Sequence, residues 1–128
     1  KLIDKHNIRH LCVWKGWIDD DEKLSLLNEC HALIIASLWE GFGLPALEAM
    51  ACGTPVIASD RGALREVMGN YGYFINPFNI QSIACAMNAV INDKKCFEKA
   101  LQEGPSRAES FNWLDTARTI EKIIQEID

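Results

Sequence analysis

The sequence has too few basic residues and too short apolar runs for two common classes of protein. Lys and Arg number 13 against 18 Asp and Glu, which gives a formal net charge of −5. A nucleic-acid surface needs clustered Lys and Arg, so we expect no nucleic-acid partner. No apolar run approaches the roughly 18 residues of a membrane-spanning helix, so any membrane contact is expected to be peripheral.

Paired cysteines are also missing. The five cysteines are scattered, and no two have the Cys-x-x-Cys spacing of a redox or metal site. They are Cys12, Cys30, Cys52, Cys85 and Cys96. The alternatives are a disulfide framework or metal site, and small buried apolar residues in a reducing compartment. We favour the second interpretation, which predicts a protein of the cytoplasm or of the cytoplasmic face of a membrane.

The pattern that is present is that of one α/β domain. The 128 residues are 48% hydrophobic and 24% charged, a mixture typical of a globular protein with a single core. Short apolar runs predict strands at 11–14, 32–36, 56–58 and 73–75. Capping residues and helical spacing predict helices after Asp19, from Pro45 to Gly53, and at 64–68, 80–91, 94–103 and 113–127. Strands that alternate with helices indicate a parallel sheet with flanking helices.

Three further expectations follow from local detail. The run at 32–36 does not alternate with polar residues, which is typical of a strand covered on both faces. The pair Gly104-Pro105 predicts a break between the last two helices. The tryptophans are expected in the core or at hinges, with lining a site beside Glu40 as the alternative for Trp39. They are Trp14, Trp17, Trp39 and Trp113.

The stretch EGFGLPALE, from Glu40 to Glu48, combines two acids with two glycines and a proline. The glycines let a ligand approach the backbone, and the helix that follows leaves N–H groups free at its positive end, where phosphate binds. Ionised Glu only accepts hydrogen bonds, so it suits the hydroxyls of sugars and ribose. A nucleotide-activated sugar has both features. The alternative is that Glu40 before the helix and Glu48 in its first turn only complement the helix dipole.

The longer run EGFGLPALEAMACGTPVI closely resembles the signature of the retaining glycosyltransferases of family 4, which have the GT-B fold. Glu40 and Glu48 stand at the spacing of that family's Glu-x7-Glu motif. The similarity extends through SDRGALREVMG, Ser59 to Gly69, and GYFINPFNIQSIACAM, Gly72 to Met87. The resemblance implies that residues 1–128 are part of a C-terminal nucleotide-sugar-binding domain. Such a domain is a Rossmann-like parallel sheet with flanking helices, here without its first strands.

The resemblance also implies roles for particular residues. As the catalytic residue, Glu40 would hydrogen-bond the donor sugar near the reacting face, and Glu48 would accept from the ribose hydroxyls. The backbone around Gly41, Phe42, Gly43 and Leu44 would meet the sugar hydroxyls and the diphosphate. The turn at Trp14, Lys15 and Gly16 corresponds to the contact with the base. No metal ion and no cofactor are expected, because the helix dipole and basic side chains replace a metal in this fold.

Other parts of the family pattern are expected to lie outside the chain, which does not begin with Met and which we interpret as a fragment. The Arg and Lys that clamp the donor diphosphate in relatives would precede Lys1, and the acceptor-binding N-terminal domain would precede them. The fragment alone is therefore expected to bind a donor weakly and to be inactive. The strand at 11–14 is left to close up against 32–36, to pair with another molecule or to stay detached, so self-association is expected.

Two residues and the function itself have alternatives. Glu66 is a weak candidate for the donor site, and a surface acid is the favoured interpretation. Asn79 stands where relatives usually have Asp, but Asn also caps a helix, so no functional consequence is expected. The alternatives to a hexosyltransferase are a non-catalytic nucleotide-sugar-binding or interaction module and a sugar-nucleotide epimerase. The intact Glu-x7-Glu motif favours transfer from a nucleoside diphosphate sugar, with a polysaccharide, lipid or small-molecule acceptor left open.

Overall fold

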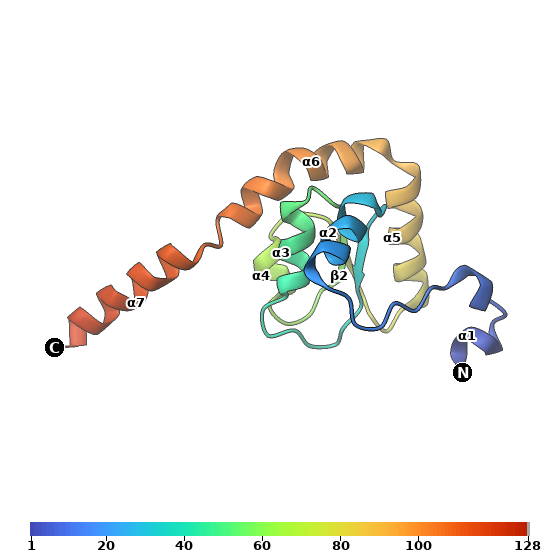
Figure 1. The fold of residues 1–128 in the computed structure, drawn as a ribbon, viewed down its shortest axis with the longest axis horizontal. Coiled ribbons are helices and arrows are strands. Elements are labelled where there is room, and N and C mark those ends of the chain that lie inside the picture. Colours follow the sequence, from blue (N-terminus) through green and yellow to red (C-terminus); the bar gives the residue numbers. More distant parts are fainter. Residues whose placement is uncertain (128) are drawn as a thin grey trace.

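The structure, a computed structural model, describes residues 1–127 and is built around a three-stranded parallel sheet. The strands are β1 (Leu33–Ile35), β2 (Val56–Ser59) and β3 (Tyr73–Ile75), side by side in chain order (Figure 1). The helices are α1 (Leu2–Lys5), α2 (Asp20–Glu29), α3 (Leu44–Ala51), α4 (Leu64–Met68), α5 (Ile80–Asn92), α6 (Lys94–Glu109) and α7 (Trp113–Ile127), with a 3₁₀ turn at Arg9–Leu11. This confirms the predicted α/β class. The last three predicted strands occur within one residue of their expected bounds.

The larger part of the core lies between the sheet and helices α3 and α4. Val56 and Ala58 of β2 point to this face, where they are fully buried together with Met50 of α3 and with Leu64 and Met68 of α4. Residues two apart in a strand share a face, so the continuous apolar run of β2 also supplies the opposite face. The central strand is therefore covered on both sides, as expected of a parallel sheet.

Helix α5 covers the opposite face, but only over β2 and β3. Ile57 and Ile75 pack there against Ala86 and Val90 of α5. Ile34 of β1 pairs with Ile57 and so lies on the same face, yet it is 40% exposed. The prediction that β1 is covered on both faces is therefore wrong, because no described helix extends over it.

The predicted strand at 11–14 is also wrong. The 3₁₀ turn ends at Leu11, and the chain then runs without regular structure to α2, with Trp14 92% exposed. An apolar run of this length becomes a buried strand only where a neighbouring strand pairs with it and helices cover its faces. The second edge of β1 has no partner strand within residues 1–127, so the segment stays detached.

Helix α6 continues through the Gly104-Pro105 pair, where the sequence predicts a break. Proline removes one backbone donor from the helix, but Gly104 is buried where α6 crosses α3. A Cβ atom at Gly104 would lie 2.6 Å from the Met50 carbonyl oxygen and 2.9 Å from the Tyr71 hydroxyl. Because this glycine lets α6 pack closely against α3, the helix continues past the proline.

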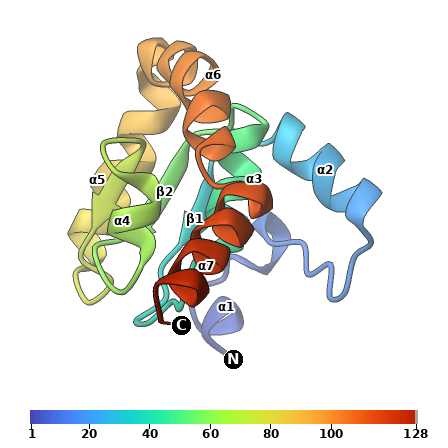
Figure 2. The ribbon, with the colours of Figure 1, turned by 90° about the vertical axis from the view of Figure 1, so that its left-hand side faces the viewer.

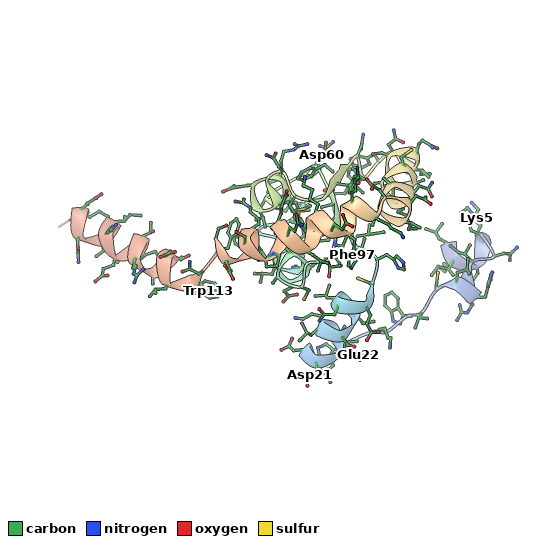
Figure 3. All side chains as sticks on the ribbon, turned by 90° about the horizontal axis from the view of Figure 1, so that it is seen from above. Lys5, Asp21, Glu22, Asp60, Phe97 and Trp113 are labelled. Atoms are coloured by element: carbon green, nitrogen blue, oxygen red, sulfur yellow. The ribbon has the colours of Figure 1, made fainter. Side chains whose placement is uncertain are left out.

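The two ends of the chain project from the body of the fold. Helix α7 extends away from the sheet and has no buried residue, and α1 lies at the opposite end (Figure 1). Figure 2 is seen from the side of α7, which projects toward the viewer. Seen from above, Trp113 marks the start of α7, and Lys5 lies in the N-terminal projection (Figure 3). The start of α7 is capped by Asn112, whose Oδ1 accepts from the Asp115 N–H at 2.8 Å. None of the described helices is long and apolar enough to cross a membrane.

The tryptophans lie outside the core, which was one of their two predicted places, and the cysteines are less buried than predicted. All four tryptophans are at least 80% exposed, so none is a core residue. The cysteines are all free, as the unpaired spacing indicated, but Cys12 and Cys85 are exposed and the other three are only half-buried. The expectation that they are buried is wrong, because these residues lie in the detached N-terminal segment and at the margins of the packed helices.

Candidate functional site

The glycine-containing loop joins the carboxyl end of β1 to the start of α3. Gly43 is the N-cap of α3, with a left-handed φ of 94°, and a Cβ atom there would lie 2.7 Å from Leu64 Cδ2. Glycine is therefore required at this position by the fold. At Gly41 a Cβ atom would meet no heavy atom within 4 Å. The backbone at Gly41 thus faces open space that a ligand can enter.

Three successive N–H groups in this loop are free. Within residues 1–127 the amides of Phe42, Gly43 and Leu44 donate to no protein acceptor, and the first helical bond is that of Ala46 N–H to the Gly43 carbonyl at 2.9 Å. Free amides at a helix N-terminus carry the positive end of the macrodipole and bind anions such as phosphate. These are the amides that the sequence predicts to meet the donor.

Glu40 begins this loop, and its backbone is fixed by the loop that follows β2. The Ala63 N–H donates to the Glu40 carbonyl oxygen at 3.1 Å, and Gly62 lies against the same peptide with a φ of 60°. The Glu40 side chain is half-buried and has no protein partner in the described part of the chain. Its carboxylate is available to accept hydroxyl donors. Sequence reasoning missed the contribution of Gly62, although its position shortly after a buried strand was visible.

Two buried hydroxyls lie at the same edge of the sheet. Ser37 Oγ follows β1 and Ser59 Oγ ends β2, and neither has a hydrogen-bond partner among residues 1–127. A buried hydroxyl without a partner costs about 1–3 kcal/mol. This edge of the sheet therefore favours a polar ligand or ordered water.

Glu48 lies in the second turn of α3, which has no acidic residue in its first turn. The alternative that Glu48 only complements the helix dipole from the first turn is therefore wrong. Its Oε1 accepts from Lys23 Nζ at 2.9 Å, and the same ammonium is 3.0 Å from Asp20 Oδ1. These contacts, that with Glu48 first, hold the pKa of Lys23 above its usual range. Sequence reasoning missed Lys23, because nothing in its spacing indicates a contact with a residue 25 positions away.

Lys15 and Gly16 lie in the exposed segment before α2, where Gly16 has a φ of 69°. Lys15 Nζ donates to Glu22 Oε1 at 2.8 Å, and this hydrogen bond raises the pKa of the lysine. Glu22 and Lys23 are neighbours in α2, so one helix joins the Lys15 segment to Glu48. The predicted cap of α2 is confirmed by the bond from Glu22 N–H to Asp19 Oδ1 at 2.8 Å.

An aromatic pair holds the middle of the loop. The rings of Phe42 and Phe111 meet edge to face, with centroids 5.9 Å apart and an interplanar angle of 87°. The guanidinium of Arg107 lies 4.8 Å from the centroid of Phe111, and its Nε donates to the Val67 carbonyl at the end of α4. The segment after α6 therefore supports the loop, and sequence reasoning did not find this contact.

Two further candidates are a surface acid and a helix cap. Glu66 is exposed on α4, in agreement with the favoured interpretation of a surface acid. Asn79 caps α5, since its Oδ1 accepts from the N–H groups of Gln81 and Ser82. Over residues 1–127, no three His, Cys, Asp or Glu side chains gather in a way that could hold a metal ion.

The sequence of the chain matches that of a known family. The model of the family described as glycosyl transferases group 1 matches residues 1–107. The chain belongs to this family. Among curated relatives, the serotype-specific mannosyltransferase WbdA of Escherichia coli is 33% identical over 118 residues, which cover 91% of this chain and 14% of that protein.

Solved structures share the fold of this chain. Sucrose-phosphate synthase from Thermosynechococcus elongatus matches with a TM-score of 0.87 at 28% identity, over 98% of this chain and 32% of that one. Anabaena Alr3699/HepE, solved in complex with UDP and glucose, gives a TM-score of 0.85 at 23% identity over 97% of this chain and 34% of that one, a likeness of fold. The predicted GT-B-like fold is confirmed. The chain spans about a third or less of each of these proteins.

Proposed function

We propose that this chain is the donor-binding part of a retaining family 4 glycosyltransferase. Residues 1–128 would form part of its C-terminal domain, which binds a nucleoside diphosphate sugar for transfer to an acceptor hydroxyl. The observation that carries the proposal is the set of three free amides at Phe42, Gly43 and Leu44, beside the unpartnered carboxylate of Glu40. Amides suit the diphosphate and a carboxylate suits sugar hydroxyls, so the loop matches both halves of such a donor.

The other predicted residues complete the donor-binding site. Glu48 accepts from the ribose hydroxyls, and the turn at Lys15 and Gly16 contacts the base. Support for a nucleotide comes from the Anabaena protein of the same fold, which was solved with UDP. Which base and which sugar this chain selects are to be determined by experiment.

Catalysis depends on the charge that develops as the sugar leaves. The bond from the anomeric carbon to the donor phosphate breaks, and the free amides of the loop stabilise the negative charge on the departing diphosphate. Glu40 holds the sugar at the reacting face, and the departing phosphate takes the proton of the acceptor hydroxyl, so that the new bond forms on the same face. Because the family resemblance implies that further basic residues complete the phosphate site, we expect residues 1–128 alone not to turn over.

The test is ligand-observed NMR on the full-length protein with a panel of UDP-, GDP- and ADP-sugars, repeated with Gly41→Ala and Glu48→Gln. Because a methyl at Gly41 meets no atom of the protein within 4 Å, Gly41→Ala should unfold at the wild-type temperature. The methyl would occupy the space that a ligand can enter, so the variant should bind the donor more weakly. Glu48→Gln should weaken binding of the same donor. If no nucleotide sugar binds at millimolar concentration, or both variants bind as the wild type does, the proposal is wrong.

Product analysis separates the alternatives. Transfer of the sugar to an acceptor with its anomeric configuration kept supports the retaining transferase. Donor binding without any product would support a non-catalytic module, and an epimerised donor would support a sugar-nucleotide epimerase.

A further inference from the structure

Lys23 of helix α2 contacts Glu48 of helix α3 through its ammonium group. Its Nζ lies 2.9 Å from Glu48 Oε1 and 3.0 Å from Asp20 Oδ1. The Lys23 and Glu48 side chains are 37% and 39% exposed, whereas Asp20 is almost wholly in solvent. The contact with Glu48 is thus the more enclosed of the two. It uses only one of the two carboxylate oxygens of Glu48.

We propose that Lys23 is a positioning residue that presents the Glu48 carboxylate to the ribose of the donor. This inference rests on the proposed function, in which Glu48 accepts from the ribose hydroxyls. A carboxylate has two oxygens and about four acceptor sites, so Oε1 can stay on Lys23 while Oε2 accepts from the ribose. Without the ammonium the Glu48 side chain regains its rotamer freedom, which donor binding must then remove.

The position of Lys23 is itself fixed by buried hydrogen bonds. Thr54 Oγ1 donates to the Leu27 carbonyl of α2 at 2.6 Å, and the Tyr71 hydroxyl donates to the Thr54 carbonyl at 2.8 Å. Leu27 is the buried residue of α2, and its packing anchors this helix on the core. The ammonium therefore comes from an anchored element. The Lys23–Glu48 contact therefore differs from ion pairs between two mobile surface side chains, which contribute little free energy.

The test measures donor kinetics of the full-length enzyme with Lys23→Met, Lys23→Arg and Glu48→Gln. Loss of a charge-assisted contact predicts that Lys23→Met raises the KM for the donor about tenfold, with kcat within about twofold of wild type. Lys23→Arg restores a cation and should recover most of the KM. Lys99→Met is the matched control, because among the described residues the ion pair of Lys99 is with Glu103 of its own helix, away from Glu48.

A donor analogue with a 2′,3′-dideoxyribose identifies the group through which Lys23 acts. With this donor, wild type and Lys23→Met should have the same KM, because Glu48 has no ribose hydroxyl to accept from. An equal KM defect with both donors would overturn the inference, because Lys23 would then act on another part of the donor or on the fold. Thermal unfolding of each variant separates those two cases.

The two proposals fail in different ways. If the wild type binds no nucleotide sugar, or both Gly41→Ala and Glu48→Gln bind the donor as the wild type does, the proposed function is wrong. If Glu48→Gln alone has the wild-type KM, the role of Lys23 is overturned, because Glu48 then does not accept from the ribose. If Glu48→Gln raises the KM while Lys23→Met does not, the donor site stands and the role of Lys23 is overturned.

Discussion

The backbone of Gly62 lies directly against that of Glu40. A Cβ atom at Gly62 would be 2.6 Å from the Glu40 carbonyl oxygen and 3.0 Å from its nitrogen, closer than packed atoms allow. The adjacent Ala63 N–H donates to the same carbonyl. The loop after β2 therefore determines where the loop after β1 places Glu40.

Gly62→Ala tests this contact. The new methyl clashes with the Glu40 peptide, and the residue keeps a left-handed φ of 60°, so we expect a loss of about 1–3 kcal/mol in the free energy of unfolding. Displacement of Glu40 should also weaken donor binding. Urea denaturation and donor titration measure the two effects. Gly41→Ala is the control for stability, and a Gly62→Ala variant with wild-type stability and affinity would contradict the packing described.

The pair Phe42 and Phe111 gives a second prediction. An edge-to-face pair is worth about 0.5–1.5 kcal/mol beyond its buried area, so Phe42→Leu and Phe111→Leu should be coupled by about that amount. A double-mutant cycle on the free energy of unfolding measures the coupling. Purely additive effects would mean that Phe111 does not support the loop.

Strands β2 and β3 and most helices were predictable because their signals are local. The apolar runs at 56–58 and 73–75 are bounded by Gly and Pro, and Asp19 and Asn79 form the caps that their spacing indicates. Glu40 and Glu48 could be singled out because their motif is continuous in the chain. Each of these features can be recognised without knowing which distant segments meet.

The features that sequence reasoning missed all depend on distant contacts. In the sequence, nothing distinguishes Lys23, Gly62 and Phe111. The fold brings Lys23 to Glu48, Gly62 to Glu40 and Phe111 to Phe42. The prediction of a break in α6 was wrong for the same reason, because the packing of Gly104 against α3 cannot be recognised in the sequence. The run at 11–14 had the composition of a strand but no neighbour to pair with.

Thiol reactivity provides a prediction at the edge of the site. Burial raises the pKa of Cys52, and the nearby Glu48 carboxylate raises it further, while burial raises that of Cys30. At pH 8 iodoacetamide should therefore modify exposed Cys12 and Cys85 before these two. Glu48→Gln removes one of the two causes and should speed alkylation of Cys52 but not of Cys30. Peptide mass spectrometry follows each site, and an unchanged Cys52 rate would show that Glu48 does not act on it.

Tyr71 predicts a specific pH dependence of stability. Burial raises the pKa of its hydroxyl above the ordinary value of 10.0. Above pH 10 the unfolded chain loses this proton while the folded chain keeps it, so the stabilisation is complete below that pH and declines as pH rises. Tyr71→Phe should cost about 1 kcal/mol at pH 7, because the bond to the Thr54 carbonyl is lost, and the cost should shrink above pH 10. Urea denaturation at pH 7, 9 and 10.5 measures the free energy of unfolding of both proteins. A difference between them that stays constant with pH would contradict the raised pKa of Tyr71.

The open edge of β1 makes self-association of the 128-residue chain the last prediction. Ile34 is 40% exposed on the face that α5 leaves uncovered, and the described sheet has no strand beyond β1. An unpaired edge with an exposed apolar side chain invites pairing with a second copy. Sedimentation velocity should therefore give a weight-average mass that rises with protein concentration. Ile34→Lys places a charge at this edge and should lower the association, whereas Ile80→Lys, at a position already 84% exposed at the start of α5, should not. A chain that stays monomeric at every concentration, or an Ile34→Lys variant that associates as the wild type does, would show that the edge is protected by other means.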